Sequence, residues 1–496
     1  MGLKSLLAKP FAALIASKVK KEAANALKDQ EKWFSYLVVQ GRKTRFGKES
    51  GFEKINSYSD WKNQVPVRDY EALKPWIDAA VEGESDVLWP GRPLYWAKTS
   101  GTTSGVKYIP ITKESIPFHI NSARNALLCY IAETGNSAFV DGKLIFLSGS
   151  PEMDKKHGVF TGRLSGIVNH HVPQYLRRNQ LPSYATNCME DWEAKVRKIV
   201  DETISENMTL ISGIPPWVQM YFDLLSERSG KSVGELFPNF SVFVYGGVNF
   251  EPYRARIEQS IGRKINTIET YPASEGFIAY QDKQAADGLL LLTNNGIFYE
   301  FIPVDEYFNE NPSRLQLHEV ELNKNYALLL STNAGLFGYS IGDTVKFVSL
   351  KPYRILVTGR IKHFISAFGE HVIGEEVEFA LMQVAKKYGV EVIEFTVAPQ
   401  VNPPEGGMPY HEWFVEFAEG TVLPSGFAEE VDHALQQKNI YYQDLISGSV
   451  LKPLVLRQMK KGSFIELMKS MGKLGGQNKV PRLSNDRKLA DALSRI

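Results

Sequence analysis

The chain has 496 residues, of which 43% are hydrophobic and 23% are charged. These values are ordinary for a soluble globular protein, and the length predicts more than one domain. Because 57 Lys and Arg residues balance 56 Asp and Glu residues, the net charge of +1 argues against nucleic-acid binding, which usually leaves a basic excess. The two cysteines, Cys129 and Cys188, are far apart, which excludes a zinc site built on cysteines and predicts a reducing, cytoplasmic compartment.

The first twenty residues combine apolar side chains with lysines. Lys9 and Pro10 interrupt the apolar run, whereas a secretory signal peptide has an unbroken apolar core. The run is also far shorter than a membrane-spanning helix. Leu6 stands where the myristoylation pattern needs Ser or Thr. We expect an amphipathic helix that packs on the body of the protein, with weak contact to a membrane surface as the alternative.

Strand-like and helix-like segments alternate from about residue 90 onward. Short apolar runs at 143–148, 208–213 and 241–245 predict buried strands. Pro215 and Pro216 predict the start of a helix, because proline is favoured in a first helical turn. The alternation predicts an α/β fold in which helices cover the sheets.

The pattern changes after Gly359 and Arg360. Residues 375–388 predict an amphipathic helix, and two strands are expected at 391–397 and 412–417. The apolar face of this helix is formed by Val377, Ala380, Leu381, Val384 and Tyr388. We therefore predict a large N-terminal domain, 1–358, and a small α+β C-terminal domain, 359–496.

A run of small and hydroxyl-bearing residues stands directly before Lys107. It comprises Ser100, Gly101, Thr102, Thr103, Ser104 and Gly105. Exposed backbone N–H groups in such a loop form a concave anion site, to which the hydroxyls add donors and Lys107 a positive charge. A triphosphate requires these features, although the spacing is not that of a P-loop. The alternative is a flexible loop in solvent.

Three further loops are predicted at strand ends, where ligands bind in open α/β sheets. Gly246 and Gly247 permit a flat ring to lie against the backbone. Glu275, in the segment 269–276, can hold Mg²⁺ together with phosphate oxygens. Asp343, just before a predicted strand at 344–348, can accept hydrogen bonds from both ribose hydroxyls. The alternatives are a plain strand-end turn, a surface glutamate and a turn aspartate.

The order of these segments along the chain resembles the acyl-adenylate-forming superfamily. Its members share a loop like residues 99–103, a tyrosine-containing loop that ends in glutamate like residues 271–275, a Gly-Asp strand and a Gly-Arg hinge. Residues 374–378 resemble the Gly-Glu-x-Glu helix start that follows this hinge.

Within the superfamily, the chain is most similar to the Gretchen Hagen (auxin-responsive promoter) family of acyl acid amido synthetases. The resemblance is carried by residues 326–337, by the Tyr-x-Ala-Ser-Glu pattern of 271–275 and by the Gly-Gln-x-Lys-x-Pro-Arg pattern of 476–482. The chain departs from the plant enzymes at Gly338 and Ser340, where they have arginines, and at 369–371, where they have a lysine. These departures weaken the case for plant hormones as substrates.

The resemblance implies two half-reactions. A carboxylic acid attacks the α-phosphate of ATP to give acyl-AMP and pyrophosphate, and an amine, such as that of an amino acid, then displaces AMP to form an amide. The resemblance also implies that the small domain rotates between the half-reactions about a hinge at 359–362.

The resemblance assigns roles to most of the candidate residues. It implies catalytic roles for Lys107, Glu275 and Lys479, with Mg²⁺ bound at Glu275. The alternative for Lys479 is an ordinary surface lysine without a catalytic role. The residues implied in ATP or AMP binding are Ser100, Gly101, Thr102, Thr103, Ser104, Gly246, Gly247, Tyr271, Ser274, Asp343 and Arg360.

The pocket for the acyl acid is expected between about residues 120 and 220, and its candidates are Arg163, His171 and Trp217. The adjacent His170 and His171 should point in different directions, which favours ordinary polar contacts over a metal site. Two other functions stay open: an acyl-CoA ligase that uses the same ATP motifs, and a non-catalytic nucleotide-binding protein.

Overall fold

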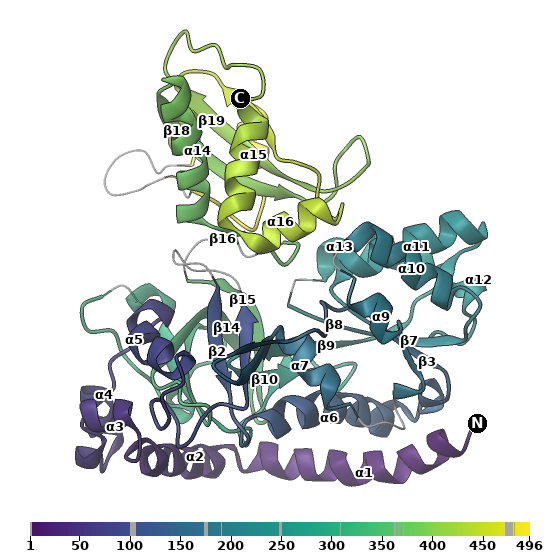
Figure 1. Ribbon diagram of the computed structural model, residues 1–496, viewed down its shortest axis with the longest axis vertical. Helices are drawn as coiled ribbons and strands as arrows, with labels where there is room; N and C mark the ends of the chain where they lie inside the picture. Colours follow the sequence, from purple (N-terminus) through teal and green to yellow (C-terminus); the bar gives the residue numbers. More distant parts are fainter. Residues whose placement is uncertain are drawn as a thin grey trace. The chain divides into compact units, whose positions relative to one another are not determined.

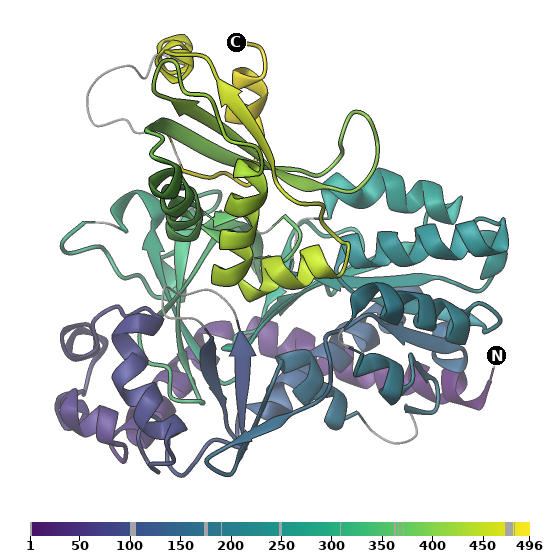
Figure 2. The ribbon, with the colours of Figure 1, turned by 45° about the horizontal axis from the view of Figure 1, so that its top comes forward.

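The computed structural model describes residues 2–99, 106–172, 177–189, 191–247, 250–307, 309–361, 364–365, 367–370, 372–471, 480 and 482–496. This part of the chain forms two compact units, which are coloured by sequence in Figures 1 and 2. Unit 1 consists mainly of residues up to Ile361, and unit 2 consists mainly of the residues after it.

Unit 1 is organised around one large sheet. Within the described residues, its strand order is β12-β13-β14-β15-β11-β10-β9-β8-β7-β3-β6. The parallel strands are β3 (Lys143–Phe146), β6 (Gln180–Leu181), β7 (Met208–Ser212), β8 (Val242–Gly246) and β9 (Asn266–Ala273). The remaining strands pair antiparallel: β10 (Gly276–Tyr280), β11 (Leu289–Leu291), β12 (Ile297–Pro303), β13 (Asn325–Thr332), β14 (Tyr339–Leu350) and β15 (Tyr353–Arg360).

Helices accompany the parallel strands because a parallel pair needs a long crossover connection. They are α6 (Ile116–Thr134), α7 (Leu164–His170), α9 (Tyr184–Asn187), α10 (Trp192–Thr203), α11 (Pro215–Ser229), α12 (Val233–Leu236) and α13 (Glu251–Ile261). Helix α6 packs on β9 and β10, while α11 packs against α13 beside the parallel strands (Figure 1). The strands predicted at 143–148, 208–213 and 241–245 are confirmed by β3, β7 and β8, and the helix predicted at Pro215 is confirmed by α11.

A smaller sheet with the order β2-β1-β5-β4 completes unit 1. It contains β1 (Tyr95–Thr99), β2 (Lys107–Ile111), β4 (Asp154–Lys156) and β5 (Val159–Gly162). Thr99 pairs with Lys107, so the segment predicted to bind phosphate connects the two strands of an antiparallel pair. Four helices lie at the same end of unit 1 (lower left in Figures 1 and 2): α2 (Ala26–Gly41), α3 (Arg45–Glu49), α4 (Tyr58–Gln64) and α5 (Tyr70–Val81).

The N-terminal helix α1 (Leu3–Ala24) packs on α6, as expected. Asp141 accepts a hydrogen bond from the backbone N–H of Gly2 at 2.6 Å, which fixes the start of the helix. The side chains buried at this contact are small, namely those of Ser5, Ala12 and Val19. Ile15 is partly buried against the same core, whereas Leu6, Leu7, Phe11 and Leu14 are exposed.

Unit 2 contains the sheet β18-β19-β20 and the short antiparallel pair β16-β17. Its strands are β16 (Phe364–Ile365), β17 (Val372–Ile373), β18 (Val392–Gln400), β19 (Tyr410–Phe417) and β20 (Val455–Met459). Its helices are α14 (Gly374–Tyr388), α15 (Phe427–Lys438), α16 (Ile440–Ser447), α17 (Ser463–Ser470) and α18 (Lys488–Leu493). The predicted helix and both predicted strands are therefore confirmed, as is the α/β class with a small α+β unit.

Helix α14 buries Val377, Ala380, Leu381 and Val384, as its spacing predicts, whereas Tyr388 is only half-buried. The reason is that the hydroxyl of Tyr388 reaches outward to the carboxylate of Glu430 on α15.

Candidate active site

The segment 269–276, predicted as a loop, is mostly a strand. Strand β9 continues to Ala273 because Tyr271 pairs with Ala279 of the antiparallel β10. Only Ser274 and Glu275 form the turn between the two strands. The antiparallel partner extends the strand beyond the point that the sequence pattern indicates, and Glu275 is left at the tip of a hairpin.

The Gly-Asp segment also differs from expectation, because β14 starts at Tyr339 and Asp343 lies within it. Asp343 pairs with Arg360 of β15, which brings the backbone of Arg360 beside it. The Asp343 side chain is only 6% exposed. A carboxylate at such a position is held in one orientation and is shielded from most of the solvent.

Two tyrosine hydroxyls connect β14 to the β9-β10 hairpin. The hydroxyl of Tyr271 donates to Oδ2 of Asp343 at 2.6 Å, and the hydroxyl of Tyr339 donates to Oε1 of Glu275 at 3.2 Å. Strands β9 and β14 are not neighbours in the sheet. The structure therefore brings Asp343 and Tyr339 beside the hairpin that carries Tyr271 and Glu275, more than 60 residues earlier in the sequence.

Tyr339 is the residue of this group that sequence reasoning did not select. It stands four residues before Asp343 in the segment Gly338 to Asp343, so the signal was present in a segment already considered. Its contact with Glu275 depends on how the sheet curves, which the local pattern does not reveal.

Gly246 and Gly247 end the strand next to Tyr271. Gly246 pairs with Thr270, and a Cβ added at Gly246 would lie 2.3 Å from the Thr270 carbonyl oxygen. Only glycine therefore allows β8 and β9 to approach this closely. Gly247 has a φ of +81°, in the region that favours glycine. The paired glycines thus adjoin Tyr271 at the carboxyl ends of two parallel strands.

Lys107 begins β2, directly after the predicted phosphate loop. Its Nζ lies 5.4 Å from the ring centroid of Tyr70 at the start of α5. The hydroxyl of Tyr70 accepts a hydrogen bond from the backbone N–H of Tyr108 at 2.9 Å. Tyr70 therefore positions the end of β2 and the lysine upon it, although no motif in the sequence marks this tyrosine.

Several candidates lie outside the described residues. They are Ser100, Gly101, Thr102, Thr103, Ser104 and Lys479. The side chain of Arg360 is likewise outside the description, although its backbone pairs with Asp343.

The acyl-pocket candidates lie at the two ends of α7 and at the start of α11. Arg163 precedes α7 and His171 follows it, so about 12 Å of helix separates their backbones. His171 contacts the hydroxyl of Tyr95 through Nε2 at 3.0 Å, and burial, followed by the charges of His170 and Arg177, lowers its pKa. Trp217 lies in the first turn of α11.

His170 makes a separate contact, through Nε2 to the backbone oxygen of Pro151 at 2.8 Å. The two adjacent rings therefore have different partners. Within the described residues, no three His, Cys, Asp or Glu side chains are grouped as metal ligands.

Lys195 is a buried cation that sequence reasoning did not select. Its Nζ donates to the backbone oxygens of Ser148 at 3.0 Å and Asn187 at 2.7 Å. Burial, followed by the charge of Arg163, lowers the pKa of Lys195 to about 8. Arg163 also lies against Gly149, where an added Cβ would be 2.8 Å from its Cδ. Two cations therefore lie near the end of β3, at the same edge of the sheet as the glycines that end β8.

The comparison with protein families covers most of the chain. The model of the GH3 family N-terminal domain matches residues 15–180 and 150–265, that of the central domain matches 290–360, and that of the C-terminal domain matches 375–488. The chain belongs to the GH3 family. The predicted family membership is thereby confirmed.

Two relatives of this GH3 protein match it over most of their length. The jasmonoyl-L-amino acid synthetase JAR6 of Nicotiana attenuata is 22% identical, over 92% of this chain and 91% of its own. The indole-3-acetic acid-amido synthetase GH3.3 of Arabidopsis thaliana is 22% identical, over 91% of this chain and 88% of its own.

Solved structures with the same fold include two kinds of ligase. AtGH3.15 acyl acid amido synthetase in complex with 2,4-DB has a TM-score of 0.62 at 15% identity, covering 97% of this GH3 protein and 95% of its own chain. 2-Hydroxyisobutyryl-CoA ligase in complex with 2-HIB-AMP and CoA has a TM-score of 0.61 at 14% identity, covering 95% and 91%. These likenesses establish a common fold, and the nearly equal TM-scores do not separate amide from thioester formation.

Proposed function

We propose that this chain activates a carboxylic acid with ATP and transfers the acyl group from acyl-AMP to the amine of an amino acid. The observation that carries the proposal is the pair of tyrosine–carboxylate contacts, Tyr271 to Asp343 and Tyr339 to Glu275, beside Gly246. Family membership over most of the chain supports it, because the relatives named above are amino acid or amido synthetases.

In the proposed first step, an oxygen of the substrate carboxylate attacks the α-phosphorus of ATP. The bond to pyrophosphate breaks, and the pyrophosphate leaves with the electron pair. Negative charge on the phosphates must be stabilised in the transition state, which is the proposed role of residues 100–104 and Lys107. Glu275 is proposed as the protein ligand of Mg²⁺. One carboxylate is sufficient, because Mg²⁺ takes most of its ligands from phosphates and water; when bound, the ion would neutralise phosphate charge.

The nucleoside is proposed to lie along the ends of β8 and β9. The adenine is proposed to lie against the backbone at Gly247, where an added Cβ would meet nothing within 4 Å. Gly246 lets β8 approach Thr270 closely, and Tyr271 lies on the same neighbouring strand. Asp343 is proposed to accept hydrogen bonds from the ribose, with its orientation fixed by the Tyr271 hydroxyl. Ser274 and Arg360 are proposed as further nucleotide contacts from the adjacent turn and strand.

In the proposed second step, the amine nitrogen attacks the acyl carbon and AMP departs, after which the nitrogen loses a proton. We propose that Lys479 contacts the phosphate from the C-terminal domain, 359–496. We also propose that Arg163, His171 and Trp217 contribute to the acyl-acid region. The free thiols of Cys129 and Cys188 support a reducing compartment such as the cytoplasm.

The proposal is tested by pyrophosphate release from ATP and Mg²⁺ with a panel of carboxylic acids. Each acid is supplied alone, with mixed amino acids and with CoA. Stimulation by an acid together with amino acids, and an amide product by mass spectrometry, is the expected result. Stimulation by CoA instead would identify the second candidate, an acyl-CoA ligase; a ligase of this kind is among the solved structures with the same fold.

A variant separates catalysis from simple nucleotide binding. Glu275→Gln is expected to reduce turnover by at least about a hundredfold, while ATP binding changes by less than about tenfold. Glu321→Gln, at an exposed glutamate elsewhere in unit 1, is the matched control and should retain full activity. ATP binding with no turnover for the wild-type protein on any acid would contradict the proposal and favour a binding protein.

A further inference from the structure

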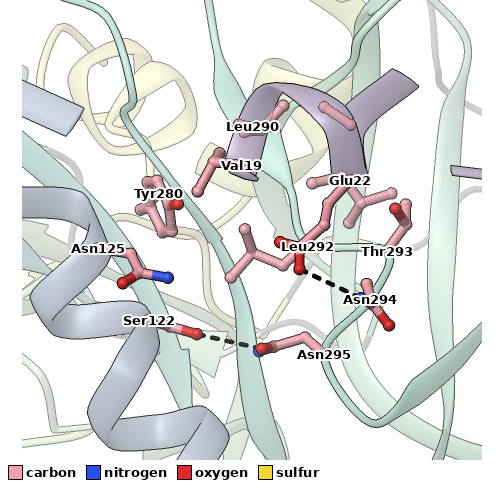
Figure 3. Close-up of a pocket in the computed structure, with 12 residues that line it drawn as sticks. Val19, Glu22, Ser122, Asn125, Tyr280, Leu290, Leu292, Thr293, Asn294 and Asn295 are labelled. Atoms are coloured by element: carbon pink, nitrogen blue, oxygen red, sulfur yellow. Dashed lines mark hydrogen bonds between the residues drawn. The ribbon is translucent and has the colours of Figure 1, made fainter. Parts of the chain in front are cut away.

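One face of helix α1 packs against the rest of unit 1. Ser5, Ala12 and Val19 recur every seven residues and are buried. Figure 3 shows Val19 and Glu22 directed toward α6 and the chain after β11, around a cavity of about 40 Å³. Glu22 accepts a hydrogen bond there from the side-chain amide of Asn294 at 3.2 Å. A cavity of this size suits one or two waters and no nucleotide, so this side of α1 is a packing surface.

The opposite face of α1 is apolar and exposed. Leu6 and Leu7 are each 61% exposed, and Leu14 is 66% exposed. Leu7 and Leu14 are seven residues apart, as are the buried Ala12 and Val19, so each pair occupies one face of the helix. Phe11 adds a ring that is 43% exposed. Figure 1 shows α1 along the edge of unit 1, with α6 on its inner side.

Basic residues border this apolar face. Helix α1 carries five lysines (Lys4, Lys9, Lys18, Lys20 and Lys21) and a single acidic residue, Glu22. At 3.6 residues per turn, Lys4 and Lys18 lie on one side of the leucines and Lys9 and Lys20 lie on the other. Lys21 follows Leu14 by seven residues and so lies on the same face as the leucines, at the C-terminal end of the helix. Arg124 of α6 contributes a further cation, 5.9 Å from the ring of Phe11. Long basic side chains can extend to a charged surface while their apolar neighbours are buried beneath.

We propose that α1 is a membrane-surface helix, which inserts Leu6, Leu7, Phe11 and Leu14 among the acyl chains of an anionic bilayer. The bordering lysines would then contact lipid phosphates and carboxylates, a combination typical of helices that lie in the interface plane. None of the described helices combines the length and the apolar character that spanning a bilayer requires.

The charge of α1 favours an anionic membrane over a second copy of the chain as the partner of this face. A two-fold symmetric contact through the same face would place the lysines of α1 close to those of its partner. Repulsion between them opposes such a dimer, whereas an anionic lipid surface attracts all five lysines at once. The inference does not depend on the proposed enzymatic function, because it concerns a face of α1 that is distant in sequence from every candidate site residue.

The experiment is co-sedimentation of the full chain with vesicles of phosphatidylcholine alone and with about one-quarter phosphatidylserine. The wild-type protein is expected to bind the anionic vesicles preferentially, and binding should fall as salt is raised. The double variant Leu7→Ser/Leu14→Ser should bind at least about tenfold more weakly, since it loses two inserted side chains. Lys18→Glu/Lys20→Glu should lose the preference for phosphatidylserine.

The matched control is Leu322→Ser/Ile393→Ser, which removes two exposed apolar side chains of other elements, 50% and 52% exposed, and should bind like the wild-type protein. Circular dichroism of each variant establishes that it folds. Absence of wild-type binding to anionic vesicles would overturn the proposal, as would equal binding by the leucine variant. Sedimentation velocity tests for self-association. If the wild-type protein is a dimer and the Leu7→Ser/Leu14→Ser variant is a monomer, the face binds a second copy of the chain and the proposal is overturned.

Discussion

The hydroxyl of Tyr271 lies 2.6 Å from Oδ2 of Asp343, and both side chains are buried. In the order of the sheet, β10, β11 and β15 stand between the strands that carry them. The sheet must therefore curve for these two side chains to meet. A short hydrogen bond to a carboxylate is stronger than one between neutral groups, so this contact fixes the side chain proposed to hold the ribose.

Removing this hydroxyl should weaken nucleotide binding while the fold is retained. We expect Tyr271→Phe to raise the KM for ATP by about tenfold, because a hydrogen bond to a charged group contributes about 1.5–3 kcal/mol. Pyrophosphate release at varied ATP concentration measures this. Tyr280→Phe, on the adjacent β10, removes another buried hydroxyl and is the control. An equal rise in KM for both variants would show that the effect is a general loss of packing.

Gly246 should not tolerate a side chain. In Gly246→Ala the new Cβ would lie 2.3 Å from the Thr270 carbonyl oxygen, so β8 and β9 must separate. We expect a loss of about 2–3 kcal/mol in the free energy of unfolding, together with loss of ATP binding. Gly213→Ala is a milder comparison, since its Cβ would meet Leu147 Cβ at 3.0 Å. Urea denaturation should show a larger loss of stability for Gly246→Ala than for Gly213→Ala. The reverse order would contradict the close approach of β8 and β9 at Gly246.

His119 should make the protein less stable in acid. It is buried on α6, and burial lowers its pKa to about 4 from 6.5. The unfolded state therefore binds the proton first, and stability is lost as the pH falls from 6.5 toward 4. His119→Leu should remove this contribution, which is about 2 kcal/mol between pH 7 and pH 5. Thermal unfolding at both pH values measures this contribution, and His318→Leu, at an exposed histidine, is the control. If the stability of the wild-type protein and of His119→Leu changed equally with pH, the prediction would be wrong.

The buried ion pair of Glu300 and Arg314 should be costly to break. Their side chains are 2.7 Å apart, and Tyr58 and Trp61 also donate to the Glu300 carboxylate. Glu300→Ala leaves the arginine charge buried without this partner, which we expect to cost about 3–5 kcal/mol of stability. Denaturant midpoints test this.

The exposed ion pair of Asp201 and Arg228 supplies the control for that measurement. Asp201→Ala should cost less than about 1 kcal/mol, because solvent screens an exposed pair. If the two alanine variants were equally stable, burial would not be the source of the effect.

Local patterns predicted the elements of the fold well. Apolar runs gave β3, β7 and β8, helical spacing gave α14, and the order of short motifs indicated the family. These features depend on residues close together in sequence, where backbone preference and periodic burial act directly. The same reasoning ended β9 too early and placed Asp343 before its strand, because pairing with an antiparallel neighbour extends both strands beyond the local apolar pattern.

The amino-acid pattern alone was enough to predict the α/β class, the family and an N-terminal helix. Only the tertiary structure paired Tyr271 with Asp343 and Tyr339 with Glu275, since these contacts depend on the curvature of a sheet whose strands come from distant parts of the chain. Only the tertiary structure placed small side chains between α1 and α6 and left Leu7 and Leu14 outside. Two helices approach closely where side chains are small, and that requirement determined which face of an apolar helix is buried.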